Sequence, residues 1–267
     1  MLSAANPPRK PIAKAHPLSK ANTTNVRVWH LPNPFFMRTL LRFFFYLLYH
    51  PFAFAYDLVA ATVSLGRWKD WVLSVQPFIE GMRVLEIGHG PGHLQRALLK
   101  QGLFTVGIDE SAPMGRLAKH NLTRSFVQKK PADSNISSKN DAYTKIRLTR
   151  SLAQYLPFPA GSFDTLVATF PADYIFDPTT IEEACRVLAP AGRFVILPGA
   201  SILGRGLMDR VMALLFRITG ETPPNLSQVL HERSGKAFAR FNFHVQIHEL
   251  EIKSSLVLIL VATKSAE

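Results

Sequence analysis

The sequence contains a single cysteine, Cys185, and this scarcity excludes several kinds of protein. No intrachain disulfide can form, and the clusters of cysteine and histidine that hold structural metals are missing. Apolar runs stay shorter than the roughly twenty uninterrupted residues that a membrane-spanning helix needs. The first thirty residues lack the continuous apolar stretch of a secretory signal. We therefore expect a cytoplasmic protein in a reducing setting that holds no metal.

Acidic residues are absent before Asp57, whereas seven Lys and Arg residues precede it, and the net charge of the whole chain is +12. Residues 1–30 are rich in Pro, Ala, Asn and Lys without apolar periodicity, which predicts a disordered basic tail. A second basic stretch runs from Arg116 to Arg150. Aromatic residues are not interleaved with these charges, so nucleic acid is not the expected partner.

The run from Val84 to Gly92 is the most informative part of the 267-residue chain. A short apolar strand contains an acidic residue near its end and is followed by three alternating glycines. Glycine adopts positive φ and admits a ligand close to the backbone, so this turn is predicted to hold a nucleotide-like cofactor. A helix beginning at His93 would direct its free N–H groups at that cofactor.

Spacing and a second carboxylate limit which cofactor is meant. A dinucleotide fingerprint needs a small residue at position 93, and His93 stands there, which weakens the pyrophosphate interpretation. About twenty residues after the glycines, the strand Val106–Asp109 ends in a carboxylate that can accept both hydroxyls of a ribose. NAD enzymes and methyltransferases share that use of a carboxylate, so Asp109 alone does not discriminate between them.

The acidic-x-Gly-x-Gly-x-Gly pattern resembles motif I of the class I S-adenosylmethionine-dependent methyltransferases. Three further segments are similar to motifs of that family, namely Asp109–Met114 (D-x-S-x-x-M), Leu156–Asp164 (L-P-F-x-x-x-S-F-D) and Arg186–Arg193 (R-V-L-x-P-G-G-R, with Ala191 in place of one glycine). The resemblance covers residues 82–197. Tyr56–Val59 and Ser64–Trp68 resemble the short helices before motif I in the branch related to ubiquinone/menaquinone C-methyltransferases.

The resemblance implies an α/β fold, with a Rossmann-like, seven-stranded, mostly parallel sheet sandwiched by helices, and S-adenosyl-L-methionine as the cofactor. The residues that it places at the cofactor are Glu86, Gly88, His89, Gly90, Gly92, Asp109, Glu110, Met114, Leu152, Ala153, Thr169 and Phe170. Many family members carry an Asp-Ala pair where this chain has Leu152 and Ala153. Adenine recognition is therefore expected from backbone groups there, with Gln154 either a helper or a solvated loop residue.

The expected organisation is a tail over residues 1–30, an aromatic helical cap over 31–80, and a methyltransferase domain over 81–267. Insertions are expected at about 121–147 and 199–230, the second including a lid helix over Leu203–Ile218, and two closing strands at Phe241–Ile252 and Leu256–Ala262. Residues 31–65 hold many Phe and Tyr side chains together with Arg38 and Arg42. These aromatics either pack as core and lid or make a peripheral contact with the inner membrane surface.

The resemblance implies direct in-line methyl transfer to a small, hydrophobic or lipid-like acceptor. The Asn/Asp-Pro-Pro-Tyr turn of the subclasses that bind an amide or adenine amino group is missing, and the apolar Phe170-Pro171 pair at its position suits an apolar acceptor. No catalytic base is assigned, while Tyr56 and His89 are candidates for substrate contact. Two alternatives stay open: a membrane-associated protein that binds S-adenosylmethionine without catalysis, and a nicotinamide-dependent oxidoreductase.

Overall fold

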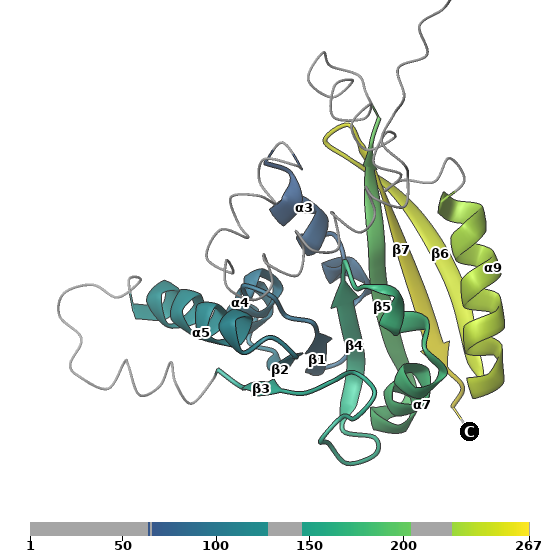
Figure 1. Ribbon diagram of the computed structural model, residues 1–267, viewed down its shortest axis with the longest axis horizontal. Helices are drawn as coiled ribbons and strands as arrows, with labels where there is room; N and C mark the ends of the chain where they lie inside the picture. Colours follow the sequence, from purple (N-terminus) through teal and green to yellow (C-terminus); the bar gives the residue numbers. More distant parts are fainter. Residues whose placement is uncertain (1–63, 65, 128–145, 204–225, 267) are drawn as a thin grey trace, which may run out of the picture.

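One seven-stranded sheet organises the computed structural model, which describes residues 64, 66–127, 146–203 and 226–266 (Figure 1). The strands are β1 (Arg83–Ile87), β2 (Phe104–Asp109), β3 (Leu148–Arg150), β4 (Phe163–Thr169), β5 (Leu188–Ile202), β6 (Phe243–Ile252) and β7 (Ser255–Lys264). Their spatial order is β3-β2-β1-β4-β5-β7-β6. The first five are parallel, and β7 runs antiparallel to both β5 and β6. The expected Rossmann-like, mostly parallel sheet is confirmed.

Helices lie on both faces of this sheet (Figure 1). They are α3 (Trp68–Leu73), α4 (His93–Lys100), α5 (Ala112–Val127), α7 (Pro178–Val187) and α9 (Leu226–Phe238), with 3-10 turns η2 (Gln76–Phe78), η3 (Asp173–Phe176) and η4 (Ala239–Phe241). Helices α3 and α4 pack on one face, and α7 and α9 pack on the other. Helix α5 contacts α4, β2 and β3.

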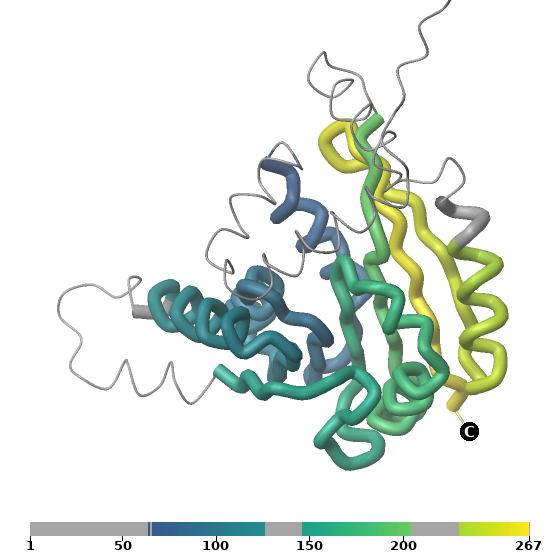
Figure 2. The backbone as a smooth tube through the Cα atoms, in the orientation of Figure 1, coloured from purple at the N-terminus to yellow at the C-terminus, as the bar shows by residue number. Residues whose placement is uncertain are grey.

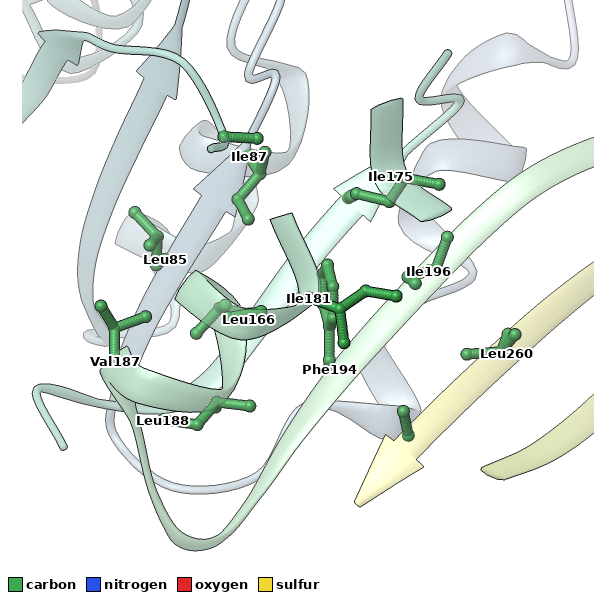
Figure 3. Packing of buried hydrophobic residues seen from close by; sticks show 14 of the residues in the cluster. Leu85, Ile87, Leu166, Ile175, Ile181, Val187, Leu188, Phe194, Ile196 and Leu260 are labelled. Atoms are coloured by element: carbon green, nitrogen blue, oxygen red, sulfur yellow. The ribbon is translucent and has the colours of Figure 1, made fainter. Parts of the chain in front are cut away.

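The alternation of side chains along each central strand builds two separate cores. In β5, Phe194 and Ile196 belong to the core under α7 and α9, whereas Val195 and Leu197 belong to the core under α3 and α4. Figure 3 shows Phe194 and Leu166 meeting Ile181 of α7 in the first of these cores. A parallel sheet covered on both faces requires such continuous apolar strands.

The two closing strands, β6 and β7, lie close to their predicted positions, and β5 is longer than the apolar run in its sequence. Strand β5 extends to Ile202, beyond the apolar run that ends at Leu197, because β7 pairs with it along that length (Figure 2). The pairing register shifts between Ile196 and Gly199, which a continuous strand pattern does not reveal. The turn from β6 to β7 uses Lys253 and Ser254, both with positive φ (47° and 59°).

Several expectations concern residues outside the described part of the chain. These are the tail, most of the cap with Tyr56, and the lid helix expected over Leu203–Ile218. Of the two expected insertions, residues 121–127 continue α5 and residues 199–202 continue β5. Among the described helices, none has the length and apolar character required to cross a membrane.

Two of the recognised sequence motifs meet as one structural unit. Arg186 of α7 donates hydrogen bonds to the carbonyls of Leu156 (2.9 Å) and Phe158 (2.7 Å). Its guanidinium also pairs with Glu183 at 2.6 Å, and Glu183 accepts from the Leu156 N–H at 2.7 Å. The R-V-L motif therefore fixes the L-P-F loop that leads into β4, and its arginine serves the fold.

We expect Arg186→Met to lower the free energy of unfolding by about 2 kcal/mol, because the charge-assisted bonds to two carbonyls and a carboxylate are lost while the aliphatic volume remains. Arg240→Met, at an exposed position in η4, is the matched control and should change stability little. Chemical denaturation of both variants measures the difference. Equal stability of the two would show that this unit does not hold the loop.

Candidate functional site

The three alternating glycines form a tight turn docked on the end of β2. Gly88, Gly90 and Gly92 have φ values of 73°, 49° and 84°. The N–H groups of Gly88 and His89 both donate to the carbonyl of Ile108, at 2.8 and 3.1 Å. Apart from its two chain neighbours, no atom of the described residues lies within 4 Å of a Cβ built on Gly90, so this side of the turn is open in the described part of the chain. The turn thus leaves bare backbone on the side of Gly90, and its contact with a cofactor stays a prediction.

Asp109 ties the end of β2 to this turn. Its Oδ2 accepts a hydrogen bond from the Gly90 N–H at 2.9 Å, and its Oδ1 accepts from the Ser111 N–H at 2.8 Å. Each carboxylate oxygen can accept more than one hydrogen bond, so both retain capacity for ligand hydroxyls. The structure brings Asp109 and Gly90 together, so the two motifs meet at one place.

Glu86 is a buried acid near the end of β1, two residues before the turn begins at Gly88. The side chain is 1% exposed, and its Oε2 has no hydrogen-bond partner in the described structure. Burial raises the pKa of Glu86 to about 8, with Asp109 adding to the rise and a hydrogen bond from Gln95 opposing it. Glu86 is therefore mostly protonated at neutral pH. An unpartnered polar atom in such a place is the mark of a group that a ligand can satisfy.

His89 lies between two motif glycines and is buried. Its Nδ1 is 2.8 Å from the Gly90 carbonyl oxygen, and since that oxygen can only accept, Nδ1 carries the proton. Burial lowers the pKa of His89, which keeps the ring neutral and leaves Nε2 as an acceptor. A Cβ at Gly107 would stand 3.0 Å from Cδ2 of the ring. The absence of a side chain at Gly107 gives the imidazole its place against β2.

The other residues predicted to lie at the cofactor differ in how deeply they are buried. Thr169 ends β4, next to β1 in the sheet. Met114 is fully buried in the packing of α5, and Ala153 is buried in the loop after β3. Leu152 is 41% exposed, and Glu110 lies exposed after β2. Glu110 and Leu152 are therefore open to a ligand from solvent, whereas Met114 is covered by the protein itself.

Phe170 and Trp68 form an aromatic wall at the carboxyl end of β4. The ring of Phe170 stacks on Trp68 of α3, with centroids 4.1 Å apart and planes inclined by 25°, and Trp71 lies 6.2 Å away. The φ of Phe170 is 51°, a strained value for a bulky residue. The sequence predicted the apolar Phe170 here but did not reveal its partner in α3.

Tyr174 borders the candidate site, and the sequence did not single it out. It lies on η3 after β4, and its hydroxyl is 3.1 Å from the position a Cβ of Gly88 would occupy. A polar hydroxyl thus overhangs the first glycine of the turn. The only available signal was a tyrosine a few residues beyond an apolar strand that ends beside the glycine motif.

Glu86→Gln should remove part of the pH dependence of stability. Unfolded glutamate ionises near pH 4.5, whereas native Glu86 stays protonated up to about pH 8, so the free energy of unfolding falls as pH rises across this window. The contribution is at most about 1.4 kcal/mol per pH unit. Thermal melts at pH 5 and pH 8 should show a smaller loss for Glu86→Gln than for the parent. The exposed-site variant Glu182→Gln is the control, and parallel losses in all three proteins would contradict the raised pKa.

The comparisons with known proteins agree with this geometry. The family described as Methyltransferase domain matches residues 85–196, which contain the glycine turn, Asp109 and Tyr174. A solved structure described as an S-adenosyl-L-methionine-dependent methyltransferase from Methanococcus maripaludis superposes with a TM-score of 0.56 at 19% identity, covering 80% of this chain and 93% of that one. This likeness shows the fold.

Sequence relatives identify the branch. The ubiquinone/menaquinone biosynthesis C-methyltransferase UbiE of Rickettsia massiliae (strain Mtu5) is 30% identical over 179 residues, which are 66% of this chain and 66% of that protein. The corresponding protein of Saccharophagus degradans is 30% identical over 156 residues, 56% of this chain and 57% of its own. With the turn, the paired Asp109 and the sheet order, these similarities show that the chain belongs to the class I S-adenosylmethionine-dependent methyltransferases, in the branch of the ubiquinone/menaquinone C-methyltransferases.

Proposed function

We propose that this chain transfers a methyl group from S-adenosylmethionine to a small, hydrophobic, quinone-related acceptor. The observation that carries the proposal is the aromatic wall of Phe170 and Trp68 at the carboxyl end of β4, in a sheet position next to the strand that leads into the glycine turn. An aromatic acceptor ring packs well against such a wall. The names of the relatives, which refer to ubiquinone and menaquinone, point to the same class of acceptor.

The residues present fit the cofactor. The open side of Gly90 admits a ligand that a side chain would exclude, and Asp109 retains acceptor capacity for two ribose hydroxyls. Glu86 offers the unpartnered Oε2 beneath the turn, where the amino acid part of the cofactor would pass. Glu110, Leu152 and the backbone of Ala153 would border the adenine. Met114 would support this border from below, since it is fully buried.

When bound, S-adenosylmethionine supplies an electrophilic methyl group that needs no further activation. The protein's part is then to align the acceptor, exclude water and hold any proton that the acceptor must lose. Tyr174 is proposed to meet an acceptor hydroxyl, because its own hydroxyl overhangs Gly88. The neutral His89 is proposed to shape the turn from the opposite side, with Nε2 available as an acceptor.

Residues 31–65 are proposed to cover the acceptor and to contact the inner membrane surface. They precede α3 in the sequence, and their one described residue, Ser64, accepts a hydrogen bond at its Oγ from the N–H of Trp68, a residue of the aromatic wall, at 2.9 Å. A lipid-like acceptor would reach the site from the membrane along this route. Tyr56, in this segment, would then be a second residue in contact with the acceptor.

Gly90→Ala should weaken cofactor binding with little further cost to the fold. The added methyl would enter the open space above the turn, while the strain at positive φ costs about 1 kcal/mol. Gly102→Ala is a matched control, because Gly102 also has positive φ (82°) and open space around its Cβ position, but lies in the turn before β2. Calorimetric titration with S-adenosylmethionine should show loss for the first variant alone. If both variants bound S-adenosylmethionine with equal affinity, the proposed position of the cofactor above Gly90 would be wrong.

The activity itself is tested by release of S-adenosylhomocysteine from the full chain incubated with S-adenosylmethionine and a reduced quinone, or with a lipid extract. Tyr174→Phe should lower the turnover several-fold and leave cofactor affinity unchanged, whereas Tyr155→Phe, at a side chain that is 74% exposed, should match the parent. Cofactor binding without product in either mixture would favour the non-catalytic alternative.

A further inference from the structure

A chain of buried polar side chains connects α4 with the strands β1 and β2. Thr105 is completely buried, and Gln95 and Glu86 are each 1% exposed. The Thr105 hydroxyl donates to Oε1 of Gln95 at 3.0 Å, and Nε2 of Gln95 donates to the Val106 carbonyl at 3.2 Å. Gln95 also makes hydrogen bonds to Glu86 from its side chain and from its backbone N–H. Because buried polar groups destabilise a fold unless they are paired, an apolar residue at position 95 would suffice for packing alone.

The partners of Gln95 fix which way its amide lies. The Val106 carbonyl can only accept, so it must face the NH2 group, and Oε1 must face the Thr105 hydroxyl. The NH2 group carries a second hydrogen, which is available to the Glu86 carboxyl. If the amide turned over, two acceptor oxygens would meet at Val106. Gln95 therefore presents a donor to Glu86 in a fixed orientation.

Gly107 provides the room for this contact. It is the residue paired with Glu86 in the register of β1 and β2. A Cβ at Gly107 would lie 3.2 Å from Cδ of Gln95, which is closer than side chains normally approach one another. The strand position beside Glu86 thus has no side chain, and the Gln95 amide occupies the space that one would take.

One oxygen of Glu86 is left over by this arrangement. Oε2 has no hydrogen-bond partner among the residues that the structure describes. The neighbours of Glu86 in the sheet, Gly107 on β2 and Val167 on β4, carry no charge. Burial raises the pKa of Glu86 to about 8 and the charge of Asp109 adds to the rise, whereas the hydrogen bonds from Gln95 lower it. Gln95 thus favours the carboxylate form in surroundings that otherwise disfavour it.

We propose that Gln95 is a positioning residue of the cofactor site, whose fixed amide holds the Glu86 carboxyl so that Oε2 receives the ammonium group of S-adenosylmethionine. The inference deepens the proposed function and rests on its placement of the amino acid part of the cofactor at the glycine turn. Pairing the ammonium with Glu86 requires the carboxylate, so the proton of Glu86 passes to the solvent as the cofactor binds. Gln95 stabilises the resulting carboxylate without touching the cofactor.

The test compares two ligands on the full-length protein by calorimetric titration. S-adenosylmethionine has the ammonium group, whereas 5′-methylthioadenosine has the same nucleoside but no amino acid part. Gln95→Met keeps the length of the side chain and removes its donor, and Thr105→Val removes the hydroxyl that orients the amide. Gln101→Met, at an exposed position just after α4, is the matched control. Thermal melts establish that each variant folds, and Thr105→Val carries the test if Gln95→Met does not fold.

Gln95→Met should bind S-adenosylmethionine roughly tenfold more weakly than the parent, with a smaller loss for Thr105→Val and none for Gln101→Met. The affinity for 5′-methylthioadenosine should be the same in all these proteins, whereas a merely structural role of Gln95 would weaken the binding of both ligands. Equal weakening of the two ligands in Gln95→Met, or unchanged affinity for S-adenosylmethionine, overturns the role of Gln95 and leaves the position of the cofactor intact.

Proton release gives a second measure. Titrations at about pH 6.5 in two buffers of different ionisation enthalpy should show about one proton released per S-adenosylmethionine bound by the parent, and none by Glu86→Gln. His89 and Asp109 are present in both proteins, so the difference belongs to Glu86. Equal proton release by the two proteins overturns the pairing of Glu86 with the ammonium. Failure of the parent to bind S-adenosylmethionine overturns this inference together with the proposed function.

Discussion

The docking of the glycine turn onto the end of β2 is the constraint on which the site depends. Two successive N–H groups, from Gly88 and His89, converge on the Ile108 carbonyl, and the next N–H, from Gly90, reaches the Asp109 carboxylate. Three consecutive donors are thereby used inside the protein at the point where the chain must leave the sheet. Left-handed glycines allow this geometry, and the open side of Gly90 is its result.

Much of this arrangement could be predicted from local sequence. The glycine spacing, the strand ending in Asp109 and the apolar strands of the sheet are local patterns, and the structure has them where they were expected. The stack of Trp68 on Phe170 and the overhang of Tyr174 are contacts between segments far apart in the chain. The periodicity of apolar residues and the helix or strand propensity of each residue do not reveal which distant segments come into contact. The length of β5 likewise follows from its pairing with β7.

The recognised motifs also separate into two physical roles. Those at the ends of β1 and β2 surround open space, whereas the L-P-F and R-V-L motifs satisfy one another through Arg186 and Glu183. The second pair holds the loop that begins β4, and β4 in turn presents Thr169 and Phe170 beside the turn. Motifs of the family are therefore found both at the candidate cofactor site and in the contacts that hold the loop before β4.

The positive φ of Phe170 depends on the packing between the end of β4 and helix α3. A bulky residue held at positive φ stores roughly 1–2 kcal/mol, and this conformation persists only while its surroundings enforce it. The ring that lies against Phe170 is Trp68 of α3. Packing against a helix that precedes β1 therefore supports the strained backbone conformation at the end of β4. A shift of that helix would remove the ring that supports this backbone conformation. A contact between two aromatic rings therefore couples the position of a helix that precedes the sheet to one backbone angle at the strand end where the acceptor is proposed to bind.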